Sequence, residues 1–321
     1  MKLFIHIGAH KTGTTSIQMA MEDSGLALAE AGFVYPRCAW YHHAQHRLAF
    51  ALKNMRDPTA GDVPDFETEL AGLNRALAES GAANALISSE VFFAQKDEAV
   101  ARLAEGLKDH QVEIIAFVRR PDELFLSSYN QNAKQPGNRF FKPLERHLEK
   151  PQSVTPDIEY FDHIGKWAAH FGKDNVHLAV YEGRDVVDTI CEILKIDASR
   201  LNKPAAAVNQ SVSGKTLELM RHLKALGAGA DIQKALIMQA AALYPPSSAA
   251  GKMPAASRRG ILERYAAKNE ALFRMLGGRE NPYDPARIDL AEEPPAEQLS
   301  KRDLVELIVR LVRIQRRQSP E

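Results

Sequence analysis

Four short apolar runs divide the first 181 residues of the chain. They cover residues 3–7, 85–88, 114–118 and 176–180, and each is nearly continuous rather than alternating. Continuous runs are typical of strands buried on both faces of a parallel sheet. Between the runs, apolar residues recur at helical spacing, as in Ile17, Met21 and Leu28, in Leu70, Leu73 and Leu77, and in Val100, Leu103 and Leu107. Strands and helices are therefore predicted to alternate, which indicates an α/β fold.

The chain beyond about residue 185 carries helical periodicity alone. Helices are predicted over residues 185–195, 211–226, 231–243, 257–276 and 300–317. Four prolines between residues 279 and 298 disfavour regular structure, so this segment is predicted to be an extended linker.

Composition and charge limit the class of partner. The 321 residues include 41 Lys and Arg against 41 Asp and Glu, and 45% are apolar. This balance argues against disorder and against nucleic acid as a partner, so an anion site has to be local. Cys38 and Cys191 fit neither a disulfide framework nor a metal site, which indicates a reducing compartment. The first apolar run is too short for a signal peptide, and we expect a cytoplasmic protein.

The loop after the first predicted strand has the features of an anion site. Residues 5–18 read IHIGAHKTGTTSIQ, a strand that enters a Gly- and Thr-rich turn and then a helix. N–H groups and the positive dipole end at a helix start favour phosphate, Gly13 allows close backbone approach, and Lys11 adds a charge. The Walker A motif requires Gly-Lys-Ser/Thr, whereas the lysine here precedes the glycine. A helix cap that binds nothing would explain one hydroxyl, but not the whole stretch.

The order HKTGTTSIQ closely resembles the 5′-phosphosulfate loop of sulfotransferases that use 3′-phosphoadenosine 5′-phosphosulfate (PAPS). The resemblance implies a P-loop-like α/β fold with a short central parallel sheet flanked by helices. It implies that Lys11 contacts the phosphosulfate and that the groups after it hold the 5′-phosphate. These groups belong to Thr12, Gly13, Thr14, Thr15 and Ser16. The resemblance covers about residues 1–200 and is poor in the helical remainder.

A second motif follows the third predicted strand. Arg119 comes directly after the run 114–118, Pro121 suits a first helical turn, and Ser127 follows about two turns later. This spacing resembles the 3′-phosphate site of the same family, which implies that Arg119 and Ser127 bind the 3′-phosphate of PAPS. Ser-x-Tyr at 127–129 is similar to the form in glycan sulfotransferases. Without the first loop, an arginine that caps the sheet edge would explain this motif equally well.

Two further matches are weaker. The strand at 176–180 leads into Tyr181, similar to a family strand end whose tyrosine approaches the adenine, and a core tyrosine is the competing interpretation. The segment Arg258-Arg259-Gly260 resembles one that helps to hold the 3′-phosphate in cytosolic members. The rest of that pattern is absent, and a solvated helix start explains the segment as well.

Sulfuryl transfer to an alcohol needs a base near the acceptor hydroxyl and a cation for the leaving phosphate, and it requires no metal. Glu90 follows the run 85–88, at a strand end between the two phosphate motifs. Glycan and lipid-sugar sulfotransferases have a catalytic glutamate in the equivalent run. The resemblance therefore implies Glu90 as the base, with His46 as the other candidate. A glutamate that only pairs with Arg or Lys at the sheet edge is the alternative.

The segment WYHHAQHR, residues 40–47, holds three imidazoles. On a helix, His42, His43 and His46 would lie near one face, at a spacing that zinc can use. No fourth ligand is evident, so the sequence favours an acceptor pocket lined by histidine and aromatic side chains. The loop 131–141 has the composition of a mobile substrate loop.

The last predicted helix, residues 300–317, combines an apolar stripe with five arginines. Such a helix can dock on its own domain, associate with a second copy of the chain, or lie on an anionic membrane. The ordinary apolar stripe favours the first two.

Together these features predict a single sulfotransferase domain over residues 1–321. It has a helical insertion on the acceptor side at about 36–84 and a helical C-terminal region over about 205–321. The expected activity is sulfuryl transfer from PAPS to a hydroxyl acceptor, by resemblance a carbohydrate or glycolipid, with release of 3′-phosphoadenosine 5′-phosphate (PAP). A metal-dependent P-loop kinase or ATPase is disfavoured by the position of Lys11. A catalytically silent protein that binds a nucleotide or a glycan also fits the sequence.

Overall fold

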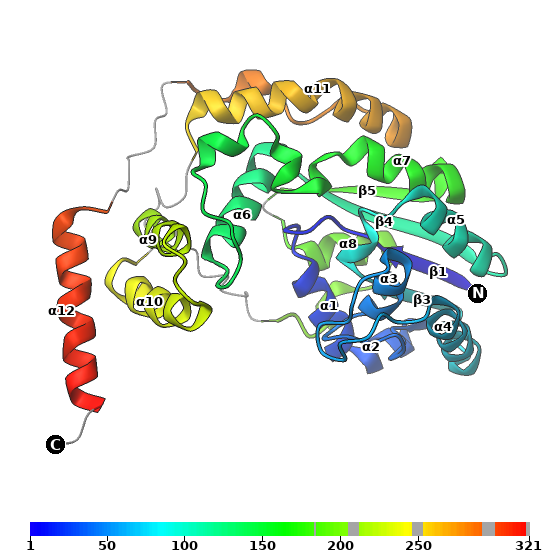
Figure 1. Ribbon diagram of the computed structural model, residues 1–321. Coiled ribbons are helices and arrows are strands. Elements are labelled where there is room, and N and C mark those ends of the chain that lie inside the picture. The colour runs from blue at the N-terminus through cyan, green and yellow to red at the C-terminus, as the bar shows by residue number, and fades with distance from the viewer. Residues whose placement is uncertain (183, 205–211, 246–252, 291–298, 319–321) are drawn as a thin grey trace. The chain divides into compact units, whose positions relative to one another are not determined.

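The computed structural model describes residues 1–182, 184–204, 212–245, 253–290 and 299–318 (Figure 1). The chain forms two compact units, which we describe one at a time. The first unit consists of Met1–Arg120, Pro156–Ala207 and Tyr265–Tyr283. The second consists of Pro121–Thr155, Val208–Arg264 and Asp284–Glu321.

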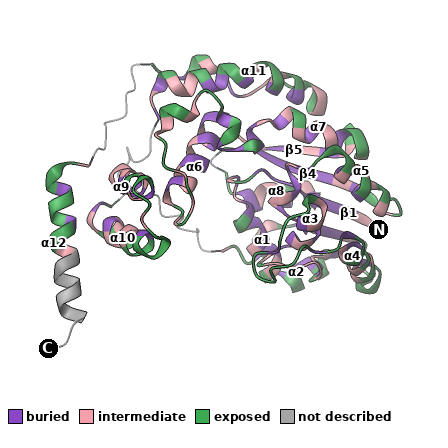
Figure 2. Cartoon of the chain, viewed as in Figure 1, coloured by how far each residue is buried: buried purple, intermediate pink, exposed green. Residues whose placement is uncertain are grey.

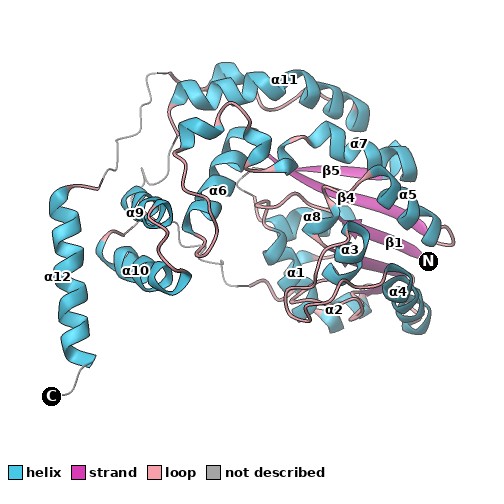
Figure 3. Ribbon diagram, in the orientation of Figure 1, coloured by secondary structure: helices cyan, strands magenta, loops and turns pink. Residues whose placement is uncertain are grey.

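A five-stranded parallel sheet forms the centre of the first unit (Figure 3). The order is β2-β3-β1-β4-β5, which confirms the predicted α/β fold with a short parallel sheet. The strands are β1 (Lys2–His6), β2 (Phe33–Val34), β3 (Asn84–Ser88), β4 (Gln111–Arg119) and β5 (Val176–Tyr181). The sequence predicts all of them except β2, which is too short to carry a pattern.

The register of the sheet aligns the polar strand ends. In the centre of the sheet, His6 of β1 pairs with Ser88 of β3 and with Ile115 of β4. Further along β4, Arg119 pairs with Tyr181 at the end of β5. The residues that follow these strands therefore meet at one edge of the sheet.

Helices of the first unit cover the sheet, whose strands are largely buried (Figure 2). They are α1 (Thr14–Asp23), α2 (Gly25–Glu30), α3 (His46–Lys53), α4 (Phe66–Ser80), α5 (Asp97–Gly106), α7 (Tyr160–Phe171) and α8 (Val186–Leu194). On one face, Phe4 and Phe117 belong to a buried cluster with Ile17 of α1 and Ile190 of α8. This packing fixes the start of α1 against the strand ends.

The spacing of Ile17, Met21 and Leu28 suggests a single helix, but the structure places these residues on two helices. The chain breaks between α1 and α2 at Ser24, which is buried. The hydroxyl of Ser24 accepts a hydrogen bond of 2.8 Å from the backbone N–H of Asn202. A side chain that binds backbone in this way favours a helix end over a continuous helix.

The second unit is helical, as the periodicity predicts. Its helices are α6 (Pro121–Lys134), α9 (Gly214–Ala225), α10 (Ala230–Leu243) and α12 (Lys301–Gln318), while α11 (Ala255–Gly277) begins here and ends in the first unit. The linker predicted over 279–298 contains a short 3-10 turn, η7 (Pro285–Arg287), so it is not wholly extended. Residues 291–298 lie outside the described part of the chain.

The described part of α12 packs on α9 and α10 through one apolar residue. Leu307 is 4% exposed and belongs to a cluster with Leu219, Ala240 and Tyr244. Lys215 pairs with Asp303 at 2.9 Å beside it. A second group of apolar side chains on α12 is exposed, namely Leu304, Val305, Ile308 and Val309. Self-association and membrane contact through this helix stay predictions.

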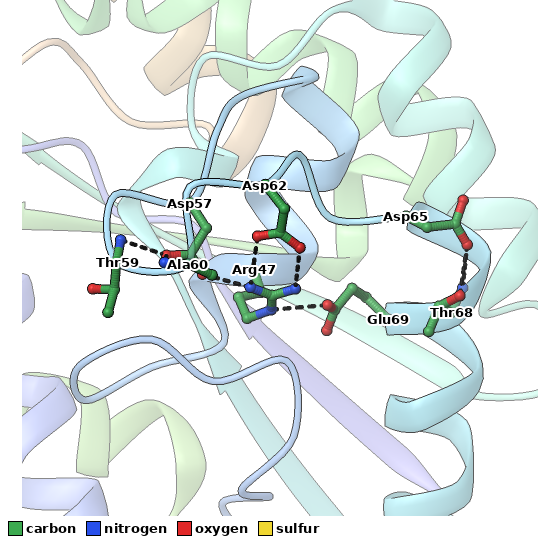
Figure 4. Close-up of polar contacts among 8 residues, drawn as sticks. All are labelled: Arg47, Asp57, Thr59, Ala60, Asp62, Asp65, Thr68 and Glu69. Carbon is green, nitrogen blue, oxygen red and sulfur yellow. Dashed lines mark hydrogen bonds and ion pairs between the residues drawn. The ribbon is translucent and has the colours of Figure 1, made fainter.

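A single arginine closes the loop between α3 and α4 (Figure 4). Arg47 of α3 donates to Asp57 at 2.6 Å and to Glu69 of α4 at 2.9 Å, and it pairs with Asp62 at 3.3 Å. Asp57 is buried, and its side chain also accepts from the N–H groups of Thr59 and Ala60.

In the described part of the chain, no helix is long and apolar enough to cross a membrane.

Candidate functional site

The carboxyl ends of β1, β3, β4 and β5 carry nearly all the residues that the sequence singles out in the first unit. In open parallel sheets, ligands bind outside this edge of the sheet. Lys11 and Gly13 follow β1, Glu90 follows β3, Arg119 ends β4 and Tyr181 ends β5. The predicted clustering of these residues is therefore what the fold produces.

The loop from β1 to α1 has an unusual backbone. Lys11 has φ 67° and Gly13 has φ 83°, both in the left-handed region. A side chain on Gly13 would also place its Cβ 2.9 Å from Val186 of α8, so only glycine fits without displacement. Thr12 is buried, and its hydroxyl donates to the carbonyl of Ala9 at 2.6 Å. Contact from Thr12 to an anion would therefore come from its backbone.

The start of α1 is open to an anion. Its N-cap, Gly13, makes no side-chain capping bond. The carbonyl of Gly13 accepts from the N–H groups of Ser16 and Ile17. The N–H groups of Gly13, Thr14 and Thr15 have no acceptor among the residues that the structure describes. Such N–H groups and the helix dipole together favour a bound anion.

Arg119 lies against this loop. Its Nη1 donates to the carbonyl of Lys11 at 3.3 Å, and its guanidinium lies 5.1 Å from the ring centre of Tyr181. The hydroxyl of Tyr160 donates to the carbonyl of Arg119 at 2.6 Å and so fixes the end of β4. The loop after β1 and the end of β4 thus form one connected structure.

A pocket of about 250 Å³ opens beside the start of α1. Gly13, Ser16 and Tyr181 line one part of it, and the start of α8 with Lys203 lines the other. A planar group next to the Tyr181 ring would be adjacent to the open N–H groups of the loop. Tyr181 is half-buried and packs against the edge of a core cluster, and its contact with adenine stays a prediction.

Ser127 lies on α6 in the second unit, whereas Arg119 belongs to the first. A shared 3′-phosphate site of these two residues stays a prediction. In the same unit, Arg258 pairs with the buried carboxylate of Asp122 at 3.1 Å. Loop 131–141 is anchored there by Lys224, whose ammonium donates to Asn138 and to two carbonyls at the end of α6. Burial lowers the pKa of Lys224 to about 8. The substrate role of this loop stays a prediction.

Glu90 is the first residue of the 3-10 turn η1 (Glu90–Phe92), directly after β3. Its Oε2 accepts a hydrogen bond of 2.9 Å from Nε2 of Gln18, which also lies 3.2 Å from the hydroxyl of Ser88. Among the residues that the structure describes, its one ion-pair neighbour is His46, with Nε2 3.9 Å from Oε2. The alternative in which Glu90 pairs with Arg or Lys is therefore not observed.

His46 begins α3 and is buried. Its Nδ1 lies 2.7 Å from the hydroxyl of Ser89, which also accepts from the N–H of Val91. The hydroxyl proton finds an acceptor only if it points to Nδ1, so the neutral imidazole carries its proton on Nε2, toward Glu90. Burial lowers the pKa of His46 despite the opposing charge of Glu90. The Nε2 edge of His46 thus lies beside Glu90, at 3.9 Å and without a hydrogen bond to it.

The charge on Glu90 is favoured by its neighbours. Burial acts to raise the pKa of Glu90, but the charges of His46 and His10 and the hydrogen bond from Gln18 outweigh it. The net pKa is therefore lowered. A carboxylate that is ionised and half-buried at a strand end is suited to accept a proton.

The three imidazoles of the segment 40–47 do not share a helix face. Only His46 is helical, whereas His42 and His43 lie in the loop before α3. His43 pairs with Glu22 at 2.5 Å, and His42 is exposed with φ 52°. The arrangement on one helix face does not occur, because α3 begins only after its N-cap, Gln45. No group of three metal-ligating side chains occurs among the described residues.

Several polar residues of the site escape sequence analysis. His6 is wholly buried at the end of β1, with Nδ1 2.8 Å from the hydroxyl of Ser88, and burial lowers its pKa to about 4. His10 binds Asp157 by its Nδ1 at 2.7 Å and by its backbone N–H at 2.8 Å. Gln18 lies within the quoted motif, but nothing in the sequence relates His10 to a residue 147 positions away.

No family model matches the sequence, and no curated protein matches it. Two solved structures show low similarity. A sulfotransferase from Alicyclobacillus acidocaldarius is 16% identical with a TM-score of 0.38, over 73% of this chain and 95% of that chain. A mouse sulfotransferase complexed with PAP is 22% identical with a TM-score of 0.36, over 61% of this chain and 59% of that chain. Likeness at this level does not assign the chain to a family.

Proposed function

We propose that the chain is a PAPS-dependent sulfotransferase that transfers the sulfuryl group to a hydroxyl of a carbohydrate or glycolipid. The observation that carries the proposal is the link between the anion loop and a carboxylate. Gln18 of α1, the helix that begins at the loop, donates to Glu90 at 2.9 Å. A cradle for an anionic donor and an ionised base thus lie on one rigid scaffold, as an in-line transfer requires.

The residues act in sequence at this edge of the sheet. Glu90 takes the proton of the acceptor hydroxyl as the acceptor oxygen forms its bond to sulfur. The bond from sulfur to the bridging oxygen breaks, and its electron pair stays on the leaving 5′-phosphate. Lys11 offsets the negative charge that develops on that oxygen, where a positioned cation is most effective. Ser89 orients the His46 ring, whose Nε2 lies 3.9 Å from the Glu90 carboxylate.

The nucleotide end of the proposal has three parts. The open N–H groups of Gly13, Thr14 and Thr15 bind the 5′-phosphate, with Ser16 beside them. Arg119 binds the 3′-phosphate, a role that the resemblance also gives to Ser127 of the second unit. Tyr181 and the adjoining pocket of about 250 Å³ receive the adenine.

The acceptor class rests on Glu90 and on the Ser-x-Tyr form, both by resemblance. The segment from Trp40 to α3 lies next to Glu90 through His46, so its histidine and aromatic side chains are the proposed acceptor lining. We also propose a cytoplasmic location, since Cys38 and Cys191 are both free thiols.

Two measurements test the function. The first titrates PAP and AMP into the protein by calorimetry in the presence of a metal chelator. Two charge-assisted contacts to the 3′-phosphate, worth about 1.5–3 kcal/mol each, predict at least a roughly hundredfold preference for PAP. Arg119→Ala should remove most of it, whereas Arg102→Ala, at an arginine of α5 that pairs with Glu67, is the matched control. Equal affinities for PAP and AMP would overturn the nucleotide assignment.

The second measurement screens hydroxyl acceptors with isotopically labelled PAPS and follows the label by mass spectrometry. Transfer to sugars that is lost in Glu90→Gln supports the proposal and names the acceptor. Tight PAP binding without transfer to any acceptor would instead identify a silent nucleotide-binding protein.

A further inference from the structure

His10 stands in the anion loop next to Lys11 and is held by a buried carboxylate. Oδ2 of Asp157 accepts two hydrogen bonds from this one residue, from its N–H at 2.8 Å and from Nδ1 at 2.7 Å. Asp157 lies in the 3-10 turn η4 (Pro156–Ile158), which belongs to the first unit. Because both bonds fix the ring, the proton on Nδ1 is committed to Asp157 and the Nε2 edge faces away from it.

The carboxylate of Asp157 needs a positive partner. Its side chain is 6% exposed, and His10 is its one ion-pair partner in the described part of the chain. An ionised carboxylate buried without a countercharge is strongly unfavourable, so the pair is stable as carboxylate and imidazolium. The His10 side chain is 50% exposed, so the ring is open to solvent although Asp157 is buried.

The other charges around His10 come from two elements. Glu90, at η1, favours the protonated ring, whereas Lys53 and His46 of α3 oppose it. His163 of α7 acts on Asp157 from the other side. Burial by itself lowers the pKa of His10, but the hydrogen bond and charge of Asp157 outweigh it, so the pKa of His10 is raised. The pKa of Asp157 is lowered for the matching reason, although burial opposes it.

We propose that His10, held as an imidazolium by Asp157, is a second catalytic cation of the sulfuryl transfer and donates from Nε2 to a non-bridging oxygen of the sulfuryl group. This role rests on the proposed function. His10 keeps its proton throughout, since the proton of the acceptor goes to Glu90. Lys11 and His10 are neighbours in the loop, and they act on different atoms. Lys11 stabilises the negative charge on the bridging oxygen, whereas His10 stabilises the negative charge on the non-bridging oxygens of the sulfuryl group.

Asp157→Asn is the diagnostic variant. The amide oxygen still accepts from Nδ1 and from the backbone, but the negative charge that keeps His10 protonated is lost. Activity needs the imidazolium, so it is lost as the pH rises through the pKa of His10. In Asp157→Asn this basic limb of the kcat profile should move to lower pH, with near-normal kcat at pH 6 and about tenfold or greater loss at pH 8. His10→Gln should lower kcat about a hundredfold at pH values below the limb and abolish the limb.

The matched control is Glu113→Gln. Glu113 also binds an imidazole, that of His177, at 2.6 Å, but near the start of β4 and away from the site. Its variant should leave the kcat profile unchanged. PAP affinity measured by calorimetry should stay within a few-fold of wild type in all variants, because the proposed contact forms in the transition state. A basic limb that stays in place in Asp157→Asn, or a loss confined to KM, would overturn the role.

Proton NMR of the histidine rings gives a readout independent of turnover. In the unliganded protein, the His10 ring should titrate above pH 6.5 in the wild type and at lower pH in Asp157→Asn. A wild-type midpoint below 6.5 would overturn the role of His10 and leave the proposed function standing. Absence of sulfuryl transfer by the wild type would instead overturn the function and this role with it. Should Asp157→Asn fail to fold, His10→Gln and His10→Lys decide, since lysine should restore part of kcat without the limb near neutral pH.

Discussion

Gln18 donates from its side-chain amide to Glu90 at 2.9 Å and lies 3.2 Å from the hydroxyl of Ser88. Gln18 is buried on α1, whereas Glu90 and Ser88 belong to the end of β3 and the turn after it. The helix whose first turn carries the open N–H groups thus also orients the Glu90 carboxylate. A shift of α1 would move both at once.

Gln18→Leu should test this link. Leucine fills a similar volume but cannot donate, so the Glu90 carboxylate loses one of the groups that lower its pKa. The pKa of Glu90 then rises, and because the base must be ionised, the acid limb of the kcat/KM profile moves to higher pH. We expect kcat/KM to be near normal at pH 8 and to fall below that of the wild type as the pH drops below 6. A uniform loss with the limb in place would reduce Gln18 to a packing role.

Glu90→Gln and His46→Asn should separate the two candidate bases. Glu90→Gln keeps the shape and loses the basicity, so kcat should fall about 10²–10⁴-fold with PAP affinity retained. His46→Asn removes the imidazole beside Glu90 and should act mainly on the KM of the acceptor. The measurement is steady-state kinetics with the acceptor found by the screen. If His46→Asn abolishes turnover and Glu90→Gln does not, the chemistry belongs to the imidazole.

Lys11→Gly and Lys11→Ala separate the charge of the lysine from its backbone. Both variants remove the cation, so both should lower kcat by more than they weaken PAP binding. Only alanine bears the cost of φ 67°, so Lys11→Ala should unfold with about 1 kcal/mol less stability than Lys11→Gly. Kinetics and urea denaturation provide the two readouts. A raised KM for PAPS with unchanged kcat would make Lys11 a uniform binding contact.

His6 should make stability depend on pH. Its folded pKa of about 4 lies below the ordinary value of 6.5, so the unfolded chain binds more protons between these values. The free energy of unfolding is therefore highest above pH 6.5 and falls as the pH drops toward 4, by about 3 kcal/mol from this residue. In His6→Asn, which can still bond to Ser88, urea denaturation at pH 7, 5.5 and 4.5 should show a decline smaller by that amount. Identical declines in both proteins would contradict the assignment.

The sheet was predictable because its strands are buried on both faces and carry continuous apolar runs. β2 was not, since Phe33 and Val34 alone make no pattern, and the break at Ser24 depends on Asn202 from a distant part of the chain. Sequence periodicity records which face of an element is buried. It does not record a hydrogen bond that ends a helix.

The residues of the site also divide into those that the sequence predicts and those that it does not. Lys11, Gly13 and Glu90 were predictable because each follows a strand, and parallel strands bring their ends together. The pairing of His10 with Asp157 was not, because it joins residues 147 positions apart with no shared motif. The zinc spacing of His42, His43 and His46 requires a single helix, and only the last of them is helical. A sequence motif identifies residues that lie close together in the chain. The partners that orient them and shift their pKa values come from distant parts of the chain.

Arg47 holds the segment between α3 and α4 closed through a cluster of ion pairs. Three carboxylates close on one guanidinium, whose fork can serve all of them, whereas a lysine ammonium is a point charge that cannot. Both thiols of the chain are free, so this ion-pair cluster closes the loop as a disulfide does in other proteins. It also makes the segment vulnerable at one point. Replacement of Arg47 should leave the sheet folded and open residues 54–65 to proteases, whose first cuts would map the released segment.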